Sequence, residues 1–235
     1  LTKPIIRKKI NKMVDVIIFQ NKDNNIEFVN YSNFKNESRM IAGSGLNVDK
    51  FKVNNQVNDK TKIIFVGRLM REKGIHEFLS IAERFKNDDN ILFFVAGKPD
   101  FGNKSSLNES QFNLLQENTS VIYLGEIDVQ KELCNYHILL QPSYHEGFSR
   151  ILIESIYSGV YCLANEIHGM KEIIEKTKYG VLVNSNNLDI YESEINNFVK
   201  RKIQPDYDYA KKIIEQNYSV LAISKKFEKL YDELS

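Results

Sequence analysis

Short apolar runs alternate along most of the chain with segments whose apolar residues recur every three or four positions. The runs are continuous rather than alternating with polar residues, which is the pattern of strands covered on both faces. Seven runs therefore predict strands, at Val14–Phe19, Lys62–Val66, Ile91–Ala96, Val121–Leu124, His137–Leu140, Val160–Leu163 and Tyr179–Val183.

The segments between these runs have helical spacing. In Ile75–Phe85, one face carries Phe78, Leu79, Ala82 and Phe85, the spacing of an amphipathic helix. Strands separated by helices require right-handed crossovers, so the pattern predicts an α/β fold with a doubly wound parallel sheet. Further helices are expected at Glu109–Glu117, Gln130–Asn135, Ser149–Tyr157 and Met170–Lys176, and the chain from Leu188 onward predicts helices only.

The first 50 residues differ in kind from the rest. They hold a basic helix candidate at Ile5–Met13, the strand Val14–Phe19, a second helical stretch and the sequence MIAGSGLNVDKF at Met40–Phe51. This is the pattern of one α/β domain ending and leading into another, with a boundary in the polar run at Lys50–Lys60. Because an α/β domain does not begin with its last strand, we expect an N-terminal portion to be missing from this chain.

Composition narrows the class of protein. The 235 residues, 42% hydrophobic and 27% charged, suffice for one large domain or for one domain and part of another. With 32 basic and 31 acidic residues, no strong field attracts nucleic acid or an anionic membrane. The absence of a long apolar run or an opening signal peptide favours a cytoplasmic location. Cys134 and Cys162 lie in apolar stretches without metal-ligand spacing, so we expect two reduced, buried thiols.

The first candidate for ligand chemistry follows the strand Lys62–Val66, because ligands of doubly wound sheets bind beyond the carboxyl ends of strands. The sequence GRLMREKG begins there with Gly67, which lacks a Cβ and lets the chain approach a ligand closely. Arg68 and Lys73 precede a helix start, where unpaired N–H groups favour anions. The motif suits a pyrophosphate; a solvated basic turn is the alternative.

The second candidate, QPSYHEGFSRILIESIYSG, follows the fifth predicted strand. Ser149 stands where a loop becomes a helix, as an N-cap or as an N–H donor to a phosphate. Glu146 lies in the loop, and Glu154 lies on the helix about one turn beyond Arg150. Carboxylates accept two hydrogen bonds each, which suits vicinal hydroxyls. Glu154 alone would be a solvated helix residue; the pair around a glycine-containing helix start favours a ligand site.

Three segments resemble the C-terminal Rossmann-like domain of the retaining GT-B glycosyltransferases of family 4. FVGRLMREKGIHEFL (Phe65–Leu79) resembles the first strand, turn and helix, and PSYHEGFSRILIESIYSG (Pro142–Gly159) resembles the signature of two glutamates separated by seven residues. HGMKEIIEKTKYGVLV (His168–Val183) resembles the segment that closes the site. The resemblance covers Met40–Ser235, and EGFSR with GSGLN is similar to members that build capsule, O-antigen or other bacterial surface polysaccharides.

The resemblance implies the C-terminal half of a GT-B fold with a remnant of the other domain. Residues 1–50 would be the tail of the N-terminal, acceptor-side domain and its connection, and residues 51–217 the nucleotide-sugar domain. Residues 218–235 would be a helix that crosses back to the N-terminal domain, with an apolar stripe along Val220–Leu234.

The resemblance also assigns roles to residues. Arg68 and Lys73 would hold the donor diphosphate, Glu146 would approach the donor sugar, and Glu154 would bind the ribose hydroxyls. The surroundings depart from the family at NEIHGM, which carries one glycine where a pair is usual and contains His168, expected at the surface rather than at the phosphates. Sugar and phosphate would contact the backbone of Gly147, Phe148 and Ser149, and the nucleobase would rest near Gly125, Glu126 and Ile127, with Gly97 and Lys98 lining the same pocket.

The function implied is transfer of a hexose, with retention, from a nucleotide-sugar to a saccharide or polyprenyl-linked acceptor. A UDP-sugar is favoured over a GDP- or ADP-sugar. No cofactor and no metal are expected, since no Asp-x-Asp motif stands in a suitable loop, and no nucleic acid is expected as a partner. Without most of the N-terminal domain the chain alone should be inactive, and that domain would bring any association with the inner face of the plasma membrane.

Three other classes of protein are alternatives to a glycosyltransferase. A nucleotide-sugar epimerase or hydrolase would share the sheet, but the arginine, lysine and paired glutamates favour a transferase. A non-catalytic nucleotide-sugar-binding protein would be expected to lose at least one of these four residues. A dinucleotide dehydrogenase needs a glycine pattern that GRLMREKG lacks.

Overall fold

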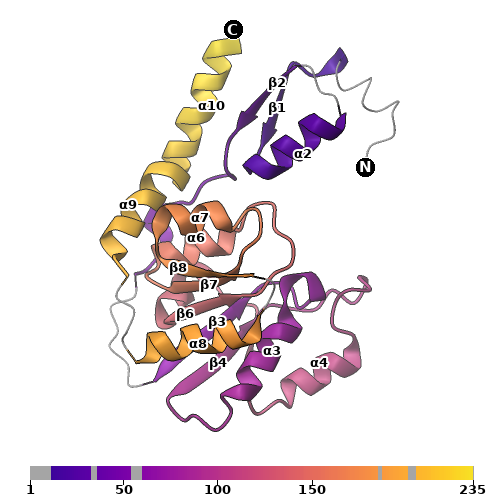
Figure 1. Ribbon diagram of the computed structural model, residues 1–235, viewed down its shortest axis with the longest axis vertical. Helices are drawn as coiled ribbons and strands as arrows, with labels where there is room; N and C mark the ends of the chain where they lie inside the picture. The colour runs from indigo at the N-terminus through magenta and orange to yellow at the C-terminus, as the bar shows by residue number, and fades with distance from the viewer. Residues whose placement is uncertain (1–11, 33–35, 54–59, 185–186, 201–204, 235) are drawn as a thin grey trace.

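The computed structural model describes residues 12–32, 36–53, 60–184, 187–200 and 205–234 (Figure 1). Its main feature is a six-stranded, wholly parallel sheet in the order β5-β4-β3-β6-β7-β8. The predicted doubly wound α/β fold is confirmed. Its strands are β3 (Thr61–Val66), β4 (Ile91–Ala96), β5 (Ile122–Gly125), β6 (Ile138–Gln141), β7 (Tyr161–Asn165) and β8 (Gly180–Val183).

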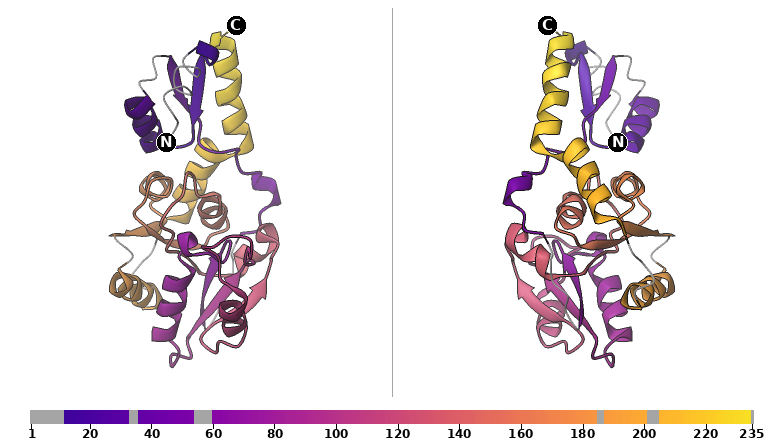
Figure 2. Two further views of the ribbon diagram at one scale, coloured as in Figure 1. Left: turned by 90° about the vertical axis from the view of Figure 1, so that its right-hand side faces the viewer. Right: turned by 90° about the vertical axis from the view of Figure 1, so that its left-hand side faces the viewer.

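Helices cover both faces of this sheet. Helix α9 packs against α6 and α7, while α3 packs against α8 (Figures 1 and 2). The helices are α3 (Ile75–Arg84), α4 (Glu109–Gln116), α5 (Val129–Glu132), α6 (Arg150–Tyr157), α7 (Lys171–Thr177), α8 (Leu188–Val199), α9 (Tyr207–Tyr218) and α10 (Val220–Leu234), with short 3-10 turns η1 (Val48–Lys50), η2 (Arg71–Lys73) and η3 (Leu133–Asn135).

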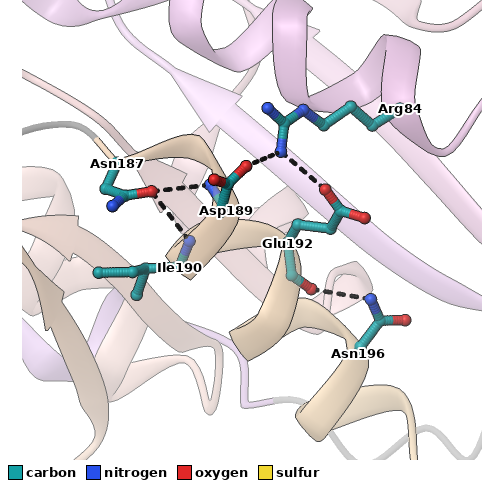
Figure 3. Close-up of polar contacts among 6 residues, drawn as sticks. All are labelled: Arg84, Asn187, Asp189, Ile190, Glu192 and Asn196. Carbon is teal, nitrogen blue, oxygen red and sulfur yellow. Dashed lines mark hydrogen bonds and ion pairs between the residues drawn. The ribbon is translucent and has the colours of Figure 1, made fainter.

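Helix α8 is fixed on α3 by a charged contact at the surface. The Arg84 guanidinium lies 2.7 Å from both the Asp189 and Glu192 carboxylates, and the Asn187 side chain caps the start of α8 (Figure 3). Exposed pairs of this kind add little stability individually. They align α8 on a face that the apolar core already holds.

The core is built by the apolar runs and the helix stripes that predicted it. The ring of Phe78 on α3 is fully buried and lies 5.5 Å from the ring of Phe65 and 5.7 Å from that of Phe93, centroid to centroid. On the same helix, Ile75, Ile81 and Ala82 are buried. The apolar residues of α3, spaced three and four positions apart, thus pack onto the neighbouring parallel strands β3 and β4.

Residues before the main sheet form a second, smaller unit with the C-terminal helix. Strand β1 (Val16–Phe19) pairs in parallel with β2 (Glu37–Met40), and α2 (Lys22–Ser32) connects them. Helix α10 lies beside this pair (Figures 1 and 2). Its Ile223 and Leu230 pack with Ile41 of the β2 end, and Val16 and Phe227 join the cluster.

Some expectations for this unit were incomplete. The prediction placed a helical stretch and then a connection where the structure has α2 and β2, because the β2 sequence ESRM has no apolar run. The helix predicted at Ile5–Met13 lies almost wholly outside the described residues, as does much of the boundary at Lys50–Lys60.

The chain passes between the small unit and the large sheet at two adjacent points. The Leu46 N–H donates to the Tyr218 carbonyl at 2.7 Å, and the Val220 N–H donates to the Leu46 carbonyl at 2.9 Å. Leu46 itself is fully buried. The outgoing and returning segments therefore support each other where the two units meet.

The cysteine prediction holds for one residue only. Cys162 on β7 is fully buried, and burial raises the pKa of its thiol well above the ordinary value. Cys134 is half-buried instead. The turn η3 directs the neighbouring Leu133 into the core and leaves the Cys134 Sγ 3.2 Å from the Lys131 carbonyl.

A core substitution tests this packing. Phe78→Ala removes a buried ring between two strands, and we expect the free energy of unfolding to fall by about 3–5 kcal/mol in urea denaturation. Leu114, 64% exposed on α4, is the matched control, and Leu114→Ala should change stability by less than about 0.5 kcal/mol. Equal losses in the two variants would contradict the placement of Phe78.

Candidate active site

The order of the strands creates one place where a ligand fits between neighbouring loops. From β3 the chain moves outward to β4 and β5 on one side, and then to β6, β7 and β8 on the other. Strands β3 and β6 are neighbours, so the loops at their carboxyl ends diverge to opposite faces and leave a crevice. Both predicted motifs follow these two strands.

The two motifs approach each other closely at Gly74. Its φ is +79°, and a Cβ there would lie 2.1 Å from the Pro142 carbonyl oxygen, a distance that no side chain tolerates. The Tyr144 N–H also donates to the Glu72 carbonyl at 2.9 Å. The turn after β3 is therefore held against the loop after β6.

This approach places Lys73 beside Glu146. The Lys73 Nζ lies 2.6 Å from the Glu146 Oε1, and the side chains are only 19% and 13% exposed. The pair joins residues 73 positions apart in the chain. The ammonium and the carboxylate are both removed from most of the surrounding water, so their interaction is screened less than that of a surface pair.

Two adjoining clefts run along this edge of the sheet. One of about 320 Å³ lies between the β3 and β6 loops, and another of about 250 Å³ lies over β3, β4 and β5. Val66 and Gly67 line both clefts, so the two clefts adjoin each other. The first is lined by Lys73, Val129, Gln141, Glu146, Phe148, Ser149, Arg150, Ile151 and Glu154, and the second by Arg68, Ala96, Gly97, Lys98, Glu126 and Ile127.

Most of the predicted site residues meet in these clefts. Gly147 and Gly125 do not line them but adjoin them: Gly147 lies between Glu146 and Phe148, and the Gly125 carbonyl accepts a hydrogen bond from the Gly97 N–H at 2.7 Å. Lys98 pairs with Glu126 at 2.9 Å, with both side chains about two-thirds exposed. The turns after β3, β4 and β5 thus form one surface.

Glu154 is a buried carboxyl at the wall of the larger cleft. It is 6% exposed, which excludes the solvated helix residue considered as the alternative. Burial raises the pKa of Glu154 above its ordinary value, and the hydrogen bond and charge of Arg150 lower it in part. The Arg150 Nε lies 2.8 Å from the Glu154 Oε1, and the Arg150 side chain is 60% exposed.

Ser149 occupies the N-cap of α6, as expected. Its side chain does not cap the helix, and its N–H is not free to bind a phosphate. Its N–H donates to the Gly169 carbonyl at 3.1 Å, so this N–H already has a partner. Its hydroxyl makes no cap hydrogen bond and is buried without a partner among the described residues. A buried hydroxyl of this kind is satisfied when a ligand or water enters the cleft.

Two polar residues of the larger cleft, Gln141 and Arg150, were not among the site residues expected from the sequence. Gln141 ends β6, and its Nε2 donates to the Ser143 hydroxyl at 2.9 Å, while its Oε1 is buried without a partner among the described residues. The Ser143 carbonyl in turn accepts from Asn165, which accepts from the Tyr191 hydroxyl at 2.8 Å. A buried polar chain thus supports the cleft floor, and a polar residue ending an apolar strand was the available signal.

His168 lies outside the clefts, as expected of a surface histidine. Its Nδ1 is 2.5 Å from the Asp23 carboxylate, and its side chain is 67% exposed. Across the described ranges, histidine, cysteine and carboxylate side chains form no group of three that would hold a metal. The helices of the described ranges include none with the length and apolar character needed to cross a bilayer.

Fold and site together define a doubly wound α/β protein of the GT-B class with a charged cleft at the switch point between its central strands. Residues 47–220 match the family model of glycosyl transferases group 1, and the chain belongs to this family.

Individual relatives agree with this membership. The gpi3 subunit of phosphatidylinositol N-acetylglucosaminyltransferase from Schizosaccharomyces pombe is 25% identical over 182 residues, 75% of this chain and 39% of that protein. The capsular polysaccharide glycosyltransferase CapM of Staphylococcus aureus is 22% identical over 204 residues, 81% of this chain and 53% of that protein. The chain thus spans about half the length of such relatives or less.

Solved structures show the same fold. Anabaena Alr3699/HepE, crystallised with UDP and glucose, superposes with a TM-score of 0.80 over 97% of this chain and 66% of that chain, at 16% identity. A GT-B fold is therefore shared despite low identity, as predicted from the three motifs.

Glu154 makes stability depend on pH. Because its pKa is raised in the folded state, its ionisation costs stability as pH rises from the unfolded value near 4.5 through the folded value. Glu154→Gln removes this cost, so the variant should melt above the wild type at pH 7, and the difference should shrink as pH falls towards 4.5. Scanning calorimetry across this pH range measures it. A variant that melts lower at pH 7 would show that the pair with Arg150 outweighs burial.

Proposed function

We propose that the chain is the donor-binding part of a glycosyltransferase that moves a hexose from a UDP-sugar to a saccharide or polyprenyl-linked acceptor, with retention of configuration. The observation that carries this is the Lys73–Glu146 pair at 2.6 Å beside the buried Glu154, in one cleft at the switch point of the sheet. The UDP and glucose in the HepE crystal support a UDP-sugar as the donor. The name of CapM, a capsular polysaccharide biosynthesis glycosyltransferase, supports a role in the synthesis of a surface polysaccharide.

The diphosphate would bind between the two clefts. Lys73 lines one cleft and Arg68 the other, and Gly67, common to both, lets the backbone approach the ligand. The Lys73 ammonium would bind one phosphate as a compact charge, and the Arg68 guanidinium would bind the other through two parallel N–H donors. In the free protein the Lys73 ammonium pairs with Glu146. When the nucleotide-sugar binds, the ammonium would pair with the diphosphate instead.

Hydroxyl-bearing groups would lie on either side of the diphosphate. Glu154 and the partnerless oxygens of Gln141 and Ser149 face a cleft where ribose hydroxyls could donate. Glu146 would face the sugar, together with the backbone of Gly147 and Phe148. The nucleobase would rest over the second cleft, between Gly97 and Ile127, with Gly125, Lys98 and Glu126 at its rim.

The chemistry asks for stabilisation of a leaving diphosphate. The oxygen of an acceptor hydroxyl bonds to the anomeric carbon as the bond from that carbon to the phosphate oxygen breaks. The electron pair of the broken bond stays on the departing diphosphate, where negative charge grows, and the diphosphate takes up the hydroxyl proton. Arg68 and Lys73 would stabilise this charge more strongly in the transition state than in the ground state. We propose that no metal or cofactor takes part, because these side chains supply the charge.

The acceptor side would come from the longer protein. The small unit of β1, α2, β2 and α10 would belong to that acceptor-side domain, and closure of the two domains would exclude water from the reaction. We propose that the whole enzyme acts in the cytoplasm, associated with the inner face of the membrane through this domain. The present chain alone should bind nucleotide weakly and transfer little sugar.

Binding of UDP tests the diphosphate site. Addition of UDP should raise the melting temperature of the chain, because a ligand that binds only the folded state stabilises it. Lys73→Met and Arg68→Ala should each weaken UDP binding by about tenfold or more in calorimetry, the effect of losing a charge-assisted hydrogen bond. Lys86→Met is the control, because Lys86 lies near Ile91 and Ile122, at the amino ends of β4 and β5 and away from the clefts. Equal binding by all four proteins would remove the diphosphate assignment.

A neutral residue at Glu146 should have the opposite effect on UDP. Glu146→Gln leaves the Lys73 ammonium uncompensated and removes one negative charge that faces the diphosphate, so UDP affinity should rise, by about threefold to tenfold for an interaction of 0.5–1.5 kcal/mol. Sugar transfer by the full-length enzyme should fall in the same variant. Weaker UDP binding by Glu146→Gln would show that Glu146 orients Lys73 rather than competing for it.

A further inference from the structure

A residue of the small unit reaches the loop that carries Glu146. Asn21 lies two residues after the end of β1, and its Nδ2 donates to the Gly147 carbonyl at 2.5 Å across 126 residues of sequence. Asn21 is 3% exposed, the most buried polar side chain of the segment before residue 41 in the described ranges. The turn between β1 and α2 is therefore in direct contact with the candidate active site.

The same loop is also in close contact with Gly169, in the segment between β7 and α7. A Cβ on Gly169, where φ is +79°, would lie 2.6 Å from the carbonyl oxygens of Glu146 and Gly147. The Gly169 carbonyl also accepts the Ser149 N–H at 3.1 Å. The loop from Glu146 to Ser149 is thus in contact both with Gly169 of the large unit and with Asn21 of the small unit.

A second contact of the same turn is weaker. Asp23 pairs with His168, next to Gly169, but the two side chains are 50% and 67% exposed. Exposed ion pairs contribute little, whereas the Asn21 hydrogen bond is partly buried and comes from a side chain with almost no contact with water. Of the two contacts, the Asn21 hydrogen bond is the one that restrains the loop.

We propose that Asn21 is a positioning residue, which fixes the Glu146–Ser149 loop and so completes the donor site from the neighbouring unit. It acts through the Gly147 carbonyl and touches no reacting atom. The effect on nucleotide binding rests on the proposed function; the restraint of the loop does not.

Asn21 has a second role that an experiment must separate. Its Oδ1 accepts the Asn24 N–H at 2.7 Å and caps the start of α2. A serine keeps a cap acceptor of nearly equal quality but is too short to reach Gly147. Asn21→Ser therefore removes the loop contact alone, while Asn21→Ala removes both contacts.

Hydrogen exchange of the Ser149 amide reports loop restraint directly. In Asn21→Ser we expect this amide to exchange about tenfold faster, the effect of losing one partly buried hydrogen bond, while amides of β3 keep their wild-type rates. Asp23→Asn, which loses only the exposed pair, should leave the Ser149 rate within about twofold of wild type. Unchanged Ser149 exchange in Asn21→Ser, with faster exchange along α2 in Asn21→Ala, would reduce Asn21 to a helix cap and overturn the proposal.

UDP binding by calorimetry extends the test to the site. Asn21→Ser should weaken UDP binding by about threefold to tenfold through the looser loop, and Asp23→Asn should not. Weaker binding in Asp23→Asn alone would assign the positioning to the exposed pair instead, against the proposal. If UDP fails to bind even the wild type, the proposed function falls, and the exchange of Ser149 still decides whether Asn21 holds the loop.

Discussion

The contact on which the rest of the site depends is the close approach of Gly74 to the Pro142 carbonyl. It holds the turn after β3 against the loop after β6 and leaves no room for a side chain. Two charged residues from distant parts of the chain, Lys73 and Glu146, then fall within 2.6 Å of each other. Parallel strands alone would bring the loops to one edge of the sheet, but this approach converts a shared edge into a cleft with opposed charges.

The cleft holds charge at a cost in stability. Glu154 is buried with a raised pKa, and the Ser149 hydroxyl and the Gln141 Oε1 are buried without partners among the described residues. A protein selected for stability alone would replace such groups with apolar ones. Their presence beside the Lys73–Glu146 pair indicates a site arranged for a polar ligand that supplies both negative charge and hydroxyl donors.

The site is not the work of the large sheet alone. The small unit contacts the loop of Glu146 through Asn21. It joins the large unit where the backbone of Leu46 forms hydrogen bonds with Tyr218 and Val220. Helix α10 lies with β1 and β2 rather than with the large sheet (Figure 1), so the first and last parts of the described chain pack into one unit. Any change in the angle between the units would thus reach the loop of Glu146 directly.

The sequence by itself determined the strands, the helices and the two motifs, because each depends on local periodicity or on residues within one turn. The run ILFFVA forms β4 and the apolar stripe forms α3, as predicted. Gly67 and Arg68 follow β3, Glu146 follows β6 and Glu154 lies on α6, in the sequence as in the structure. It missed β2, whose ESRM has no apolar pattern, and the exposure of Cys134. Only the tertiary structure placed Gln141 and Arg150 in the cleft and Asn21 against its loop. The contacts of these polar side chains depend on residues that the fold brings next to them. Burial and partner distance are properties of packing, and no local spacing encodes them.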